Sequence, residues 1–268
     1  EEFSEIYYLS GADELIYQDS VASLYNRNSL LEIVKKTSNA IFIPLTVGGG
    51  IRSIEDIRNL LLAGADKVSI NTASIKNPSI IYEGAKKFGS QCIVSGIDAY
   101  RKNNGDYEVW VDYGREPTGI NVFEWAKEVE NLGAGEIFLN SINRDGMGIG
   151  YDIELTNKIS SLVKIPIIAG GGAGRKKDLS EVLKKGNASA ISASSIFHYY
   201  YANPQNRKAV QKKYKELRMG KSVDSGNLDF LRNGYGGERT VTVKPISIKE
   251  AKIYLKQKGF NVRQDSYE

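Results

Sequence analysis

The chain has 268 residues, of which 41% are hydrophobic and 25% are charged, and its formal net charge is +4. This composition is close to the globular average and excludes a collagen, a coiled-coil rod and a wholly disordered chain. So small a positive surplus does not predict nucleic-acid binding, and it leaves small anionic ligands as candidates.

Cysteine and histidine each occur once, as Cys92 and His198. A single cysteine permits no internal disulfide and is typical of a reducing cytoplasm, where we expect the protein to act. A single histidine argues against a His-rich metal site, so we expect no metal and no cofactor. Cys92 is interpreted as a small core residue within a strand, and His198 as a packing or capping residue. No apolar run approaches the roughly 20 residues that cross a membrane, and the first residues show no signal-peptide pattern.

Short apolar runs alternate with longer helical patterns along most of the chain. Strands are predicted over residues 14–17, 41–47, 67–70, 93–97, 136–139, 165–169 and 188–192. Helices are predicted between them, for example over 54–62 after the N-cap candidate Ser53, over 122–131 and over 178–185. This alternation is typical of βαβ units and predicts a parallel sheet.

The sequence also repeats itself at a constant distance. Residues 12–16 resemble 134–138, residues 44–50 resemble 166–172, and Gly64 matches Gly186, with an offset of 122 positions in every case. This offset exceeds the period of a solenoid and fits four βα units. We therefore predict an α/β fold, a (β/α)8 TIM barrel built of two half-barrel repeats.

The repeat leaves one predicted strand without a counterpart. The strand at 93–97 would match a segment 122 positions earlier, which lies before residue 1. We therefore expect the first βα unit to be missing, with residues 1–201 supplying units two to eight and starting inside the first helix. Residues 202–246 are expected to form an extended tail insertion, and 247–268 a C-terminal helix that closes the barrel. Within the tail we predict a basic, solvated helix over 205–218, a loop over 219–237 and a short strand over 240–243.

Two glycine-rich turns stand at equivalent places in the two halves, each after a strand and before a helix. Glycine there lets backbone N–H groups approach an anion, and the helix N-terminus adds a favourable dipole. Either turn alone could be a tight turn without a ligand, but the symmetric pair favours a substrate with a phosphate at each end. The first predicted cradle comprises Gly48, Gly49, Gly50, Asn71 and Thr72, and the second comprises Gly171, Gly172, Ser194 and Ser195.

Carboxylates follow three strands at the face where barrel active sites form. Asp98 follows the strand at 93–97, Asp145 comes after the strand at 136–139, and Asp19 follows the first strand. Such groups can act as general acids and bases, although helix capping or pairing with Arg144 is an alternative, above all for Asp19. Asp98 is the strongest catalytic candidate because no helix pattern begins directly after it.

Glu14, Lys67 and Glu136 stand at the opposite ends of their strands, where each strand begins. Because alternate strands fill one layer of a barrel interior, we expect these three charges to lie together. Alternating signs would allow the buried charges to pair. The residues alone do not decide between a structural salt-bridge ring and a functional role.

Six groups of residues carry a family resemblance: 46–52, 65–72, 88–91, 135–137, 144–146 with 150–152, and 195–198. Together they resemble the cyclase subunit of imidazole glycerol phosphate synthase. The resemblance extends from about residue 1 to Tyr199 and resumes over 248–263. The related phosphoribosyl-formimino isomerase shares the half-barrel repeat and the paired phosphate sites, but the runs at 88–91 and 196–198 are similar to the cyclase.

The resemblance implies a lyase-type cyclase of histidine biosynthesis, which combines ammonia with a bisphosphorylated formimino-aminoimidazole-carboxamide ribonucleotide. It also implies a glutaminase partner on the N-terminal mouth of the barrel. Ammonia would cross the barrel past a charged gate that matches Glu14, Lys67 and Glu136. The family's second catalytic aspartate matches Asp98, and we include Asp145 and Gly146 in the phosphate-binding set. The first catalytic aspartate and a loop lysine belong to the first βα unit.

Some features depart from the family pattern. The segment 202–245 is longer than usual, and Asn140 and Asn143 stand where a threonine and an aspartate are common. The runs 224–227 and 233–237 look similar to paralogues that accompany amidotransferases of surface-glycan synthesis. An alternative function is therefore an ammonia conduit and scaffold for an enzyme of nonulosonate or amino-sugar synthesis.

Overall fold

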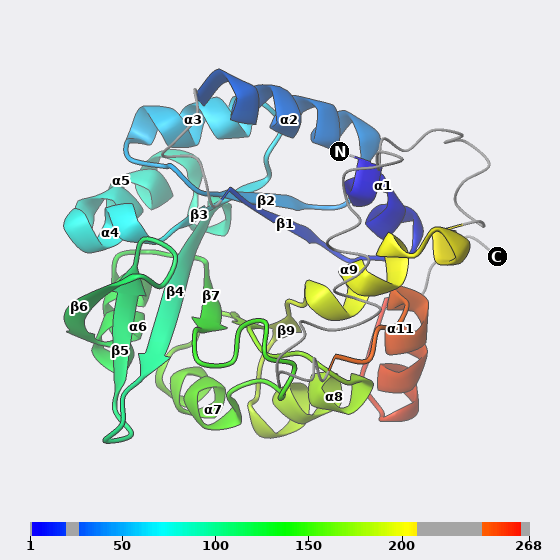
Figure 1. Ribbon diagram of the computed structural model, residues 1–268. Helices are drawn as coiled ribbons and strands as arrows, with labels where there is room; N and C mark the ends of the chain where they lie inside the picture. The colour runs from blue at the N-terminus through cyan, green and yellow to red at the C-terminus, as the bar shows by residue number, and fades with distance from the viewer. Residues whose placement is uncertain (1, 20–26, 208–242, 264–268) are drawn as a thin grey trace.

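The computed structural model describes residues 2–19, 27–207 and 243–263. In these residues a curved sheet of parallel strands is surrounded by helices, and strands alternate with helices along the chain (Figure 1). This is the α/β fold of a TIM barrel, as the sequence predicts. Within the described ranges, no helix has both the length and the apolar character needed to cross a membrane.

Among the described residues, seven strands follow one another around the sheet in the order β1-β2-β3-β4-β7-β8-β9, and each neighbouring pair is parallel. Their bounds are β1 Leu15–Gln18, β2 Leu45–Gly48, β3 Lys67–Ile70, β4 Ile93–Arg101, β7 Glu136–Ser141, β8 Ile167–Gly170 and β9 Ala190–Ile191. The strands predicted over 41–47 and 165–169 begin only after Pro44 and Pro166, because proline has no N–H for the ladder. The parallel order brings the carboxyl ends of all seven strands to one mouth of the barrel.

Helices cover the outer face of the sheet (Figure 1). The helix that follows β2 has the predicted bounds, because Ser53 caps it by accepting a hydrogen bond from Asp56 N at 3.1 Å. In the part of the chain that the structure describes, the α-helices are α1 Glu2–Leu9, α2 Arg27–Ala40, α3 Ile54–Leu62, α4 Thr72–Lys76, α5 Ser79–Phe88, α6 Val122–Asn131, α7 Ile153–Leu162, α8 Lys176–Lys185, α9 Ser195–Ala202 and α11 Ile248–Gln257; the 3₁₀ helices are η1 Ser90–Cys92 and η2 Pro204–Arg207.

Strand β4 is longer than the sequence predicts, and its last residues, Tyr100 and Arg101, extend beyond its pairing with β7. From Asp98 onward it pairs with the antiparallel strand β5 (Tyr107–Val111), which pairs in turn with β6 (Glu116–Asn121). This three-stranded arm stands outside the ring of parallel strands (Figure 1). Neither β5 nor β6 is among the predicted strands. Tyr107–Val111 has strand-favouring residues but lies outside the βα alternation, and β6 contains Pro117 and Gly119, which are rare in strands.

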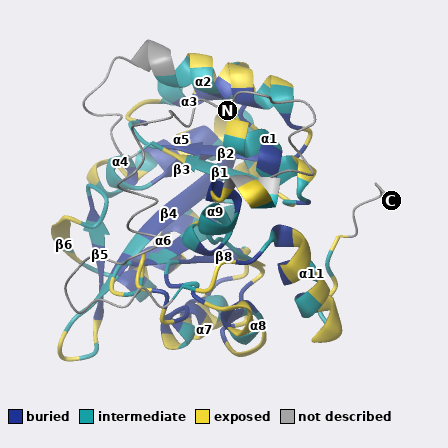
Figure 2. Cartoon of the chain, turned by 45° about the vertical axis from the view of Figure 1, so that its right-hand side comes forward, coloured by how far each residue is buried: buried dark blue, intermediate teal, exposed yellow. Residues whose placement is uncertain are grey.

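The side chains of the parallel strands alternate between the helix layer and the interior of the ring. Val68, Ile70, Ile137 and Leu139 face the helices and are fully buried in the main hydrophobic cluster. The alternate residues face the interior instead: Lys67 and Ser69 on β3, and Glu136, Phe138 and Asn140 on β7. Figure 2 shows this arrangement as buried strands inside a shell of helices whose outer faces are exposed.

A second hydrophobic cluster joins α8, α9 and α11 through Leu179, Ile196 and Leu255. The loop and the strand predicted over 219–237 and 240–243 lie outside the described residues, except for the strand's last residue. The predicted helix at 205–218 also lies largely outside them. Its first residues belong to the 3₁₀ helix η2, where Pro204 begins a tighter turn.

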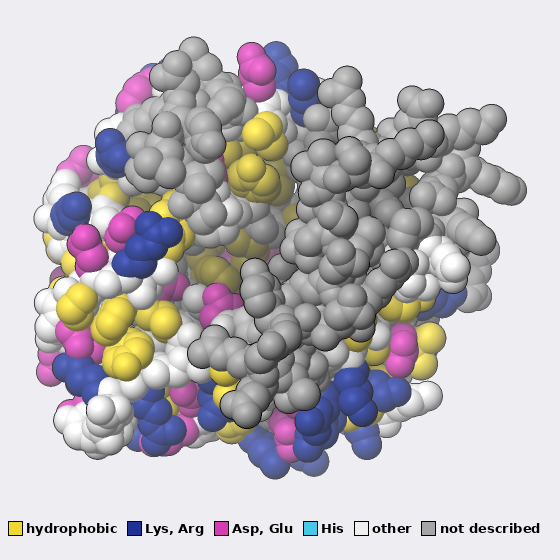
Figure 3. Space-filling model, viewed as in Figure 1, with side chains coloured by type: hydrophobic (Ala, Val, Ile, Leu, Met, Phe, Trp, Pro, Cys, Tyr) yellow, Lys and Arg dark blue, Asp and Glu magenta, His cyan; other side chains and the backbone are white. Residues whose placement is uncertain are grey.

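The described surface carries charges of both signs. Figure 3 shows Lys and Arg side chains along the edge that α8 forms, with acidic side chains among them. Lys176 Nζ lies 3.3 Å from a Glu250 oxygen, and Lys185 Nζ lies 3.3 Å from a Glu181 oxygen. Paired charges of this kind are typical of a solvated surface and do not indicate a nucleic-acid site.

Candidate functional site

Asp98 lies on β4 at the carboxyl mouth of the barrel, between two asparagines. Asn71, directly after β3, donates from Nδ2 to Asp98 Oδ2 at 2.8 Å. Asn140, the register partner of Asp98 on β7, donates from Nδ2 to Oδ1 at 3.1 Å. Each carboxylate oxygen therefore accepts one amide N–H, which fixes the orientation of the group.

The pKa of Asp98 is raised to about 6, and burial is the largest cause. The amides of Asn140 and Asn71 oppose burial because they stabilise the charged form, whereas the negative charge of Asp145 adds to it. A carboxyl group with a pKa this close to neutrality can both accept and donate a proton. General acid-base catalysis requires that ability.

The first glycine turn follows β2 at the same mouth. Gly49 and Gly50 have φ values of +102° and +68°, in the left-handed region that favours glycine. A Cβ on Gly49 would meet the backbone carbonyl of Asp19, so the turn packs closely on the end of β1. After the next strand, Asn71 and Thr72 stand at the N-terminus of α4. The structure thus brings the residues of the first predicted cradle to neighbouring strand ends.

The second glycine turn follows β8 and repeats this geometry. Gly171 and Gly172 have φ values of +79° and +103°. A Cβ on Gly171 would lie 2.7 Å from Asn140 Oδ1, so this turn touches the amide that holds Asp98. Ser194 and Ser195 begin α9, and no capping bond engages the Ser194 side chain. In the strand order, β4 with Asp98 stands two strands from β2 and two from β8.

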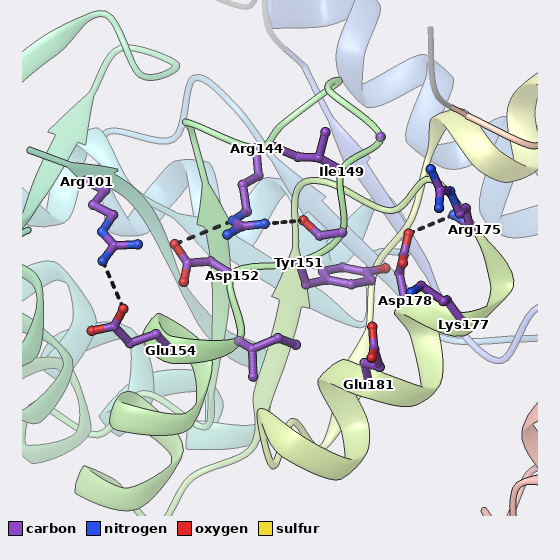
Figure 4. Close-up of a pocket in the computed structure, with 13 residues that line it drawn as sticks. Arg101, Arg144, Ile149, Tyr151, Asp152, Glu154, Arg175, Lys177, Asp178 and Glu181 are labelled. Atoms are coloured by element: carbon purple, nitrogen blue, oxygen red, sulfur yellow. Dashed lines mark hydrogen bonds and ion pairs between the residues drawn. The ribbon is translucent and has the colours of Figure 1, made fainter.

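The loop between β7 and α7 carries Asp145 and Gly146, both exposed. Arg144 holds this loop together through two contacts (Figure 4). It donates to the Gly150 carbonyl at 3.2 Å, and its Nε lies 3.8 Å from Asp152 Oδ2. Arg144 therefore pairs with Asp152 and not with Asp145, the pairing considered from the sequence.

The same residues line a cavity of about 450 Å³ between this loop and the starts of α7 and α8 (Figure 4). Two ion pairs stand in its wall: Arg144 with Asp152, and Arg101 with Glu154 at 3.0 Å. These pairs tie the loop and β4 to the start of α7.

Glu14, Lys67 and Glu136 lie together at the opposite, N-terminal mouth. Lys67 Nζ is 3.0 Å from Glu14 Oε2 and 2.7 Å from Glu136 Oε1. Burial lowers the pKa of Lys67, but its bonds to Glu136 and Glu14 outweigh burial and hold that pKa above its usual value. Lys67 therefore stays charged, and the side chain of Glu14, 43% exposed, opens the group to solvent.

The profile of the histidine biosynthesis protein family matches residues 1–202 of the chain. The chain belongs to this family. It is 53% identical over 194 residues to the "Imidazole glycerol phosphate synthase subunit HisF" of Hydrogenobaculum sp. (strain Y04AAS1), covering 72% of this chain and 77% of that protein. It is 48% identical over 219 residues to the protein of the same name from Dehalococcoides mccartyi (strain BAV1), covering 81% and 86%.

The remaining sequence candidates take other places in this member of the histidine biosynthesis family. Asp19 presents its backbone carbonyl to the hydroxyl of Tyr113 at the carboxyl mouth. His198 lies in an aromatic group, its Nδ1 2.8 Å from the Tyr7 hydroxyl. Cys92 ends η1 just before β4 and is half-buried, so it does not lie within a strand as interpreted from the sequence. Among the described residues, no group of three His, Cys, Asp or Glu side chains could hold a metal ion.

The sequence analysis does not predict two features of the site: the bond from Asn140 to Asp98 and the contacts of Tyr113. Asn140 stands four residues after Glu136, as Asn71 stands four after Lys67, and this even spacing puts both amides on the interior face. That signal is available from the sequence once the strands are known. The contacts of Tyr113 have no such signal, because they depend on the unpredicted arm.

Proposed function

We propose that the protein is the cyclase subunit of an imidazole glycerol phosphate synthase, a lyase of histidine biosynthesis. It combines ammonia with a bisphosphorylated formimino-aminoimidazole-carboxamide ribonucleotide and releases imidazole glycerol phosphate, aminoimidazole carboxamide ribonucleotide and one molecule of water. The observation that carries this proposal is the position of Asp98, two strands from each of two repeat-related glycine turns. The names of the two curated relatives support the same reaction.

The chemistry follows from this placement. The two cradles bind the two phosphates, so that the reacting part of the substrate lies over Asp98. The Asp98 carboxylate accepts a proton from the incoming nitrogen and can return one to the departing amine, since its pKa of about 6 suits both steps. The amides of Asn71 and Asn140 keep the carboxylate in place throughout.

Two buried acceptors support a route for ammonia through the barrel. Glu136 Oε2, beside Lys67, is buried and has no hydrogen-bond partner among the described residues. Asn71 Oδ1, beside Asp98, is also buried and has no hydrogen-bond partner among the described residues. A buried acceptor without a partner suits a small N–H donor that visits the site. This supports the gate role for Glu14, Lys67 and Glu136.

The glutaminase partner fits the N-terminal mouth. Phe42 lies between α2 and β2 and is 83% exposed, and Leu9 ends α1 and is 54% exposed. Both precede barrel strands, so they lie at the same end as Lys67. The Phe42 ring lies 6.1 Å from that of Tyr8, the neighbour of Leu9 in α1. Exposed apolar side chains gathered in this way are typical of a protein–protein interface. Neither the comparisons nor the described residues favour the conduit alternative, and we place the enzyme in the cytoplasm because its lone cysteine permits no internal disulfide.

The experiment that tests the reaction is an assay of the full-length protein with ammonium and the bisphosphorylated substrate. We expect turnover to imidazole glycerol phosphate. Phosphate soaked into crystals should also appear at both glycine turns. An ordered structure with density at neither turn, or a protein with no turnover, would refute the proposed reaction.

The partner is tested separately by replacing Phe42 with aspartate. A charge at the centre of an apolar interface should abolish activation by glutamine and glutaminase while turnover with ammonium persists. Tyr82, 53% exposed on the outer helix α5, gives the matched control Tyr82→Asp. If Phe42→Asp and Tyr82→Asp show the same activation by glutamine and glutaminase, the N-terminal mouth is not the docking face.

A further inference from the structure

The turn between β5 and β6 has a disfavoured backbone. Asp112 and Tyr113 have φ values of +47° and +59°, and Gly114 follows at +73°. Asn187 is the one other described non-glycine residue with a positive φ. A side chain in this region crowds the backbone, and asparagine tolerates the crowding better than tyrosine does. Such conformations persist only where surrounding contacts hold them, and they concentrate at functional sites.

Two hydrogen bonds hold this turn over the first phosphate cradle. Asp112 N–H donates to Thr72 Oγ1 at 3.1 Å, and the Tyr113 hydroxyl donates to the Asp19 carbonyl. Thr72 follows β3 and Asp19 follows β1, while β2 with its glycine turn lies between those strands in the sheet. The segment Asp112–Tyr113 therefore spans the cradle from one side to the other.

The Asp19 carbonyl connects Tyr113 to the glycine turn. It lies so close to Gly49 that a Cβ there would meet it. The phenol thus holds one wall of the cradle from outside while the glycine backbone forms the other wall. Without the hydroxyl, that carbonyl loses this tie to the arm, and the end of β1 can move away from the turn.

We propose that Tyr113 is a positioning residue for the substrate phosphate bound at the turn Gly48–Gly50. Its hydroxyl holds the end of β1 against Gly49 and keeps the backbone N–H groups of the turn arranged for the anion. The identity of the substrate rests on the proposed function, but the effect on anion binding does not.

The protonation state of the phenol agrees with this role. Burial raises the pKa of Tyr113, and the negative charges of Asp19, Asp112 and Asp98 raise it further. The hydroxyl therefore keeps its proton at neutral pH and can donate to the carbonyl.

The arm has internal bonds of its own and does not depend on Tyr113 for its fold. Thr118 Oγ1 donates to the Val109 carbonyl at 2.6 Å, and Glu108 lies 2.9 Å from Lys102 Nζ. Thr118→Val therefore gives a matched control, since it removes a side-chain bond to a carbonyl within the same arm without touching the cradle.

The test compares Tyr113→Phe, Thr118→Val and wild type in the full-length protein. Titration with inorganic phosphate should show that Tyr113→Phe weakens one of two phosphate sites about three- to tenfold, the factor expected of one hydrogen bond. With ammonium, the KM for the bisphosphorylated substrate should rise by the same factor while kcat changes little. Thr118→Val should leave both quantities at the wild-type value.

Unchanged phosphate affinity in Tyr113→Phe would overturn the inference, as would an equal loss in Thr118→Val. A fall in kcat with unchanged KM would also overturn it, because the residue would then act in the chemical step. A wild type without turnover would refute the proposed function alone, and the phosphate titration would still decide the role of Tyr113.

Discussion

Replacing Asp98 with asparagine separates its role in catalysis from its effect on stability. The amide keeps the shape of the side chain but cannot accept a proton. Loss of a general acid-base group costs ~10²–10⁴-fold in rate, and we expect turnover of the full-length protein with ammonium to fall by that factor. Substrate binding should change little, because both glycine turns are untouched.

The same substitution should not destabilise the protein at neutral pH. The pKa of Asp98 is about 6 in the folded protein against an ordinary value of 3.8. A carboxyl group with a raised folded-state pKa contributes stability below the lower value, and that contribution is lost as the pH rises through the higher one. The loss corresponds to about 3 kcal/mol at neutral pH. Asparagine carries no charge and avoids much of this loss of stability, although its N–H₂ group then faces the N–H donors of Asn71 and Asn140.

Urea unfolding of wild type and Asp98→Asn at several values between about pH 4 and pH 7 measures this effect. The variant should gain stability relative to wild type as the pH rises, by up to about 3 kcal/mol. Asp106→Asn, a substitution at an exposed hairpin turn, is the control and should show no such gain. Near wild-type turnover would demote Asp98 to a structural residue, and a flat stability difference would refute burial as the source of its raised pKa.

Further predictions concern the charged gate, the two amides that bond Asp98 (the amide clamp, Asn71 and Asn140) and the second glycine turn. Lys67→Met should keep turnover with ammonium but change turnover with glutamine and glutaminase; equal losses that follow a fall in Tm would return Lys67 to a structural role. Asn140→Leu removes a bond that stabilises charged Asp98, so the acid limb of the kcat/KM profile should move up by about 1–2 pH units, and an unmoved limb would argue against the clamp. Gly171→Ala places a Cβ against Asn140 and should raise KM, whereas Gly105→Ala, with φ +89° but open space around it, should cost stability alone.

The repeat is the sequence feature that predicts most of this fold. An offset of 122 residues does not depend on the propensity of any segment, and it predicts both the barrel and the paired glycine turns. Local capping predicts element bounds equally well. Ser53 and Asn121 accept hydrogen bonds from the first turns of α3 and α6, and those helices have the predicted limits.

Contacts between distant segments account for what the sequence does not predict. The bond from Tyr113 to the Asp19 carbonyl joins residues 94 positions apart, and no local pattern encodes it. In the arm that carries Tyr113, β5 has strand-favouring residues and pairs with β4, whereas β6 contains proline and glycine and is stabilised by pairing with β5. The Asn140 amide is partly predictable. Strand alternation predicts that it points into the barrel, but its bond to Asp98 depends on the register between β4 and β7.

At β1, β3 and β7 a charged residue at the start of the strand stands four positions before a polar residue at the carboxyl mouth: Glu14 and Gln18, Lys67 and Asn71, and Glu136 and Asn140. Four residues of strand span about 13 Å, so strand length itself sets the distance between the charged group at one mouth and the residues around Asp98 at the other. An insertion of one residue within such a strand would turn the far side chain to the other face. Substitutions can therefore change either end of the barrel in evolution, whereas an insertion or deletion within the strands that join the two ends would disrupt both.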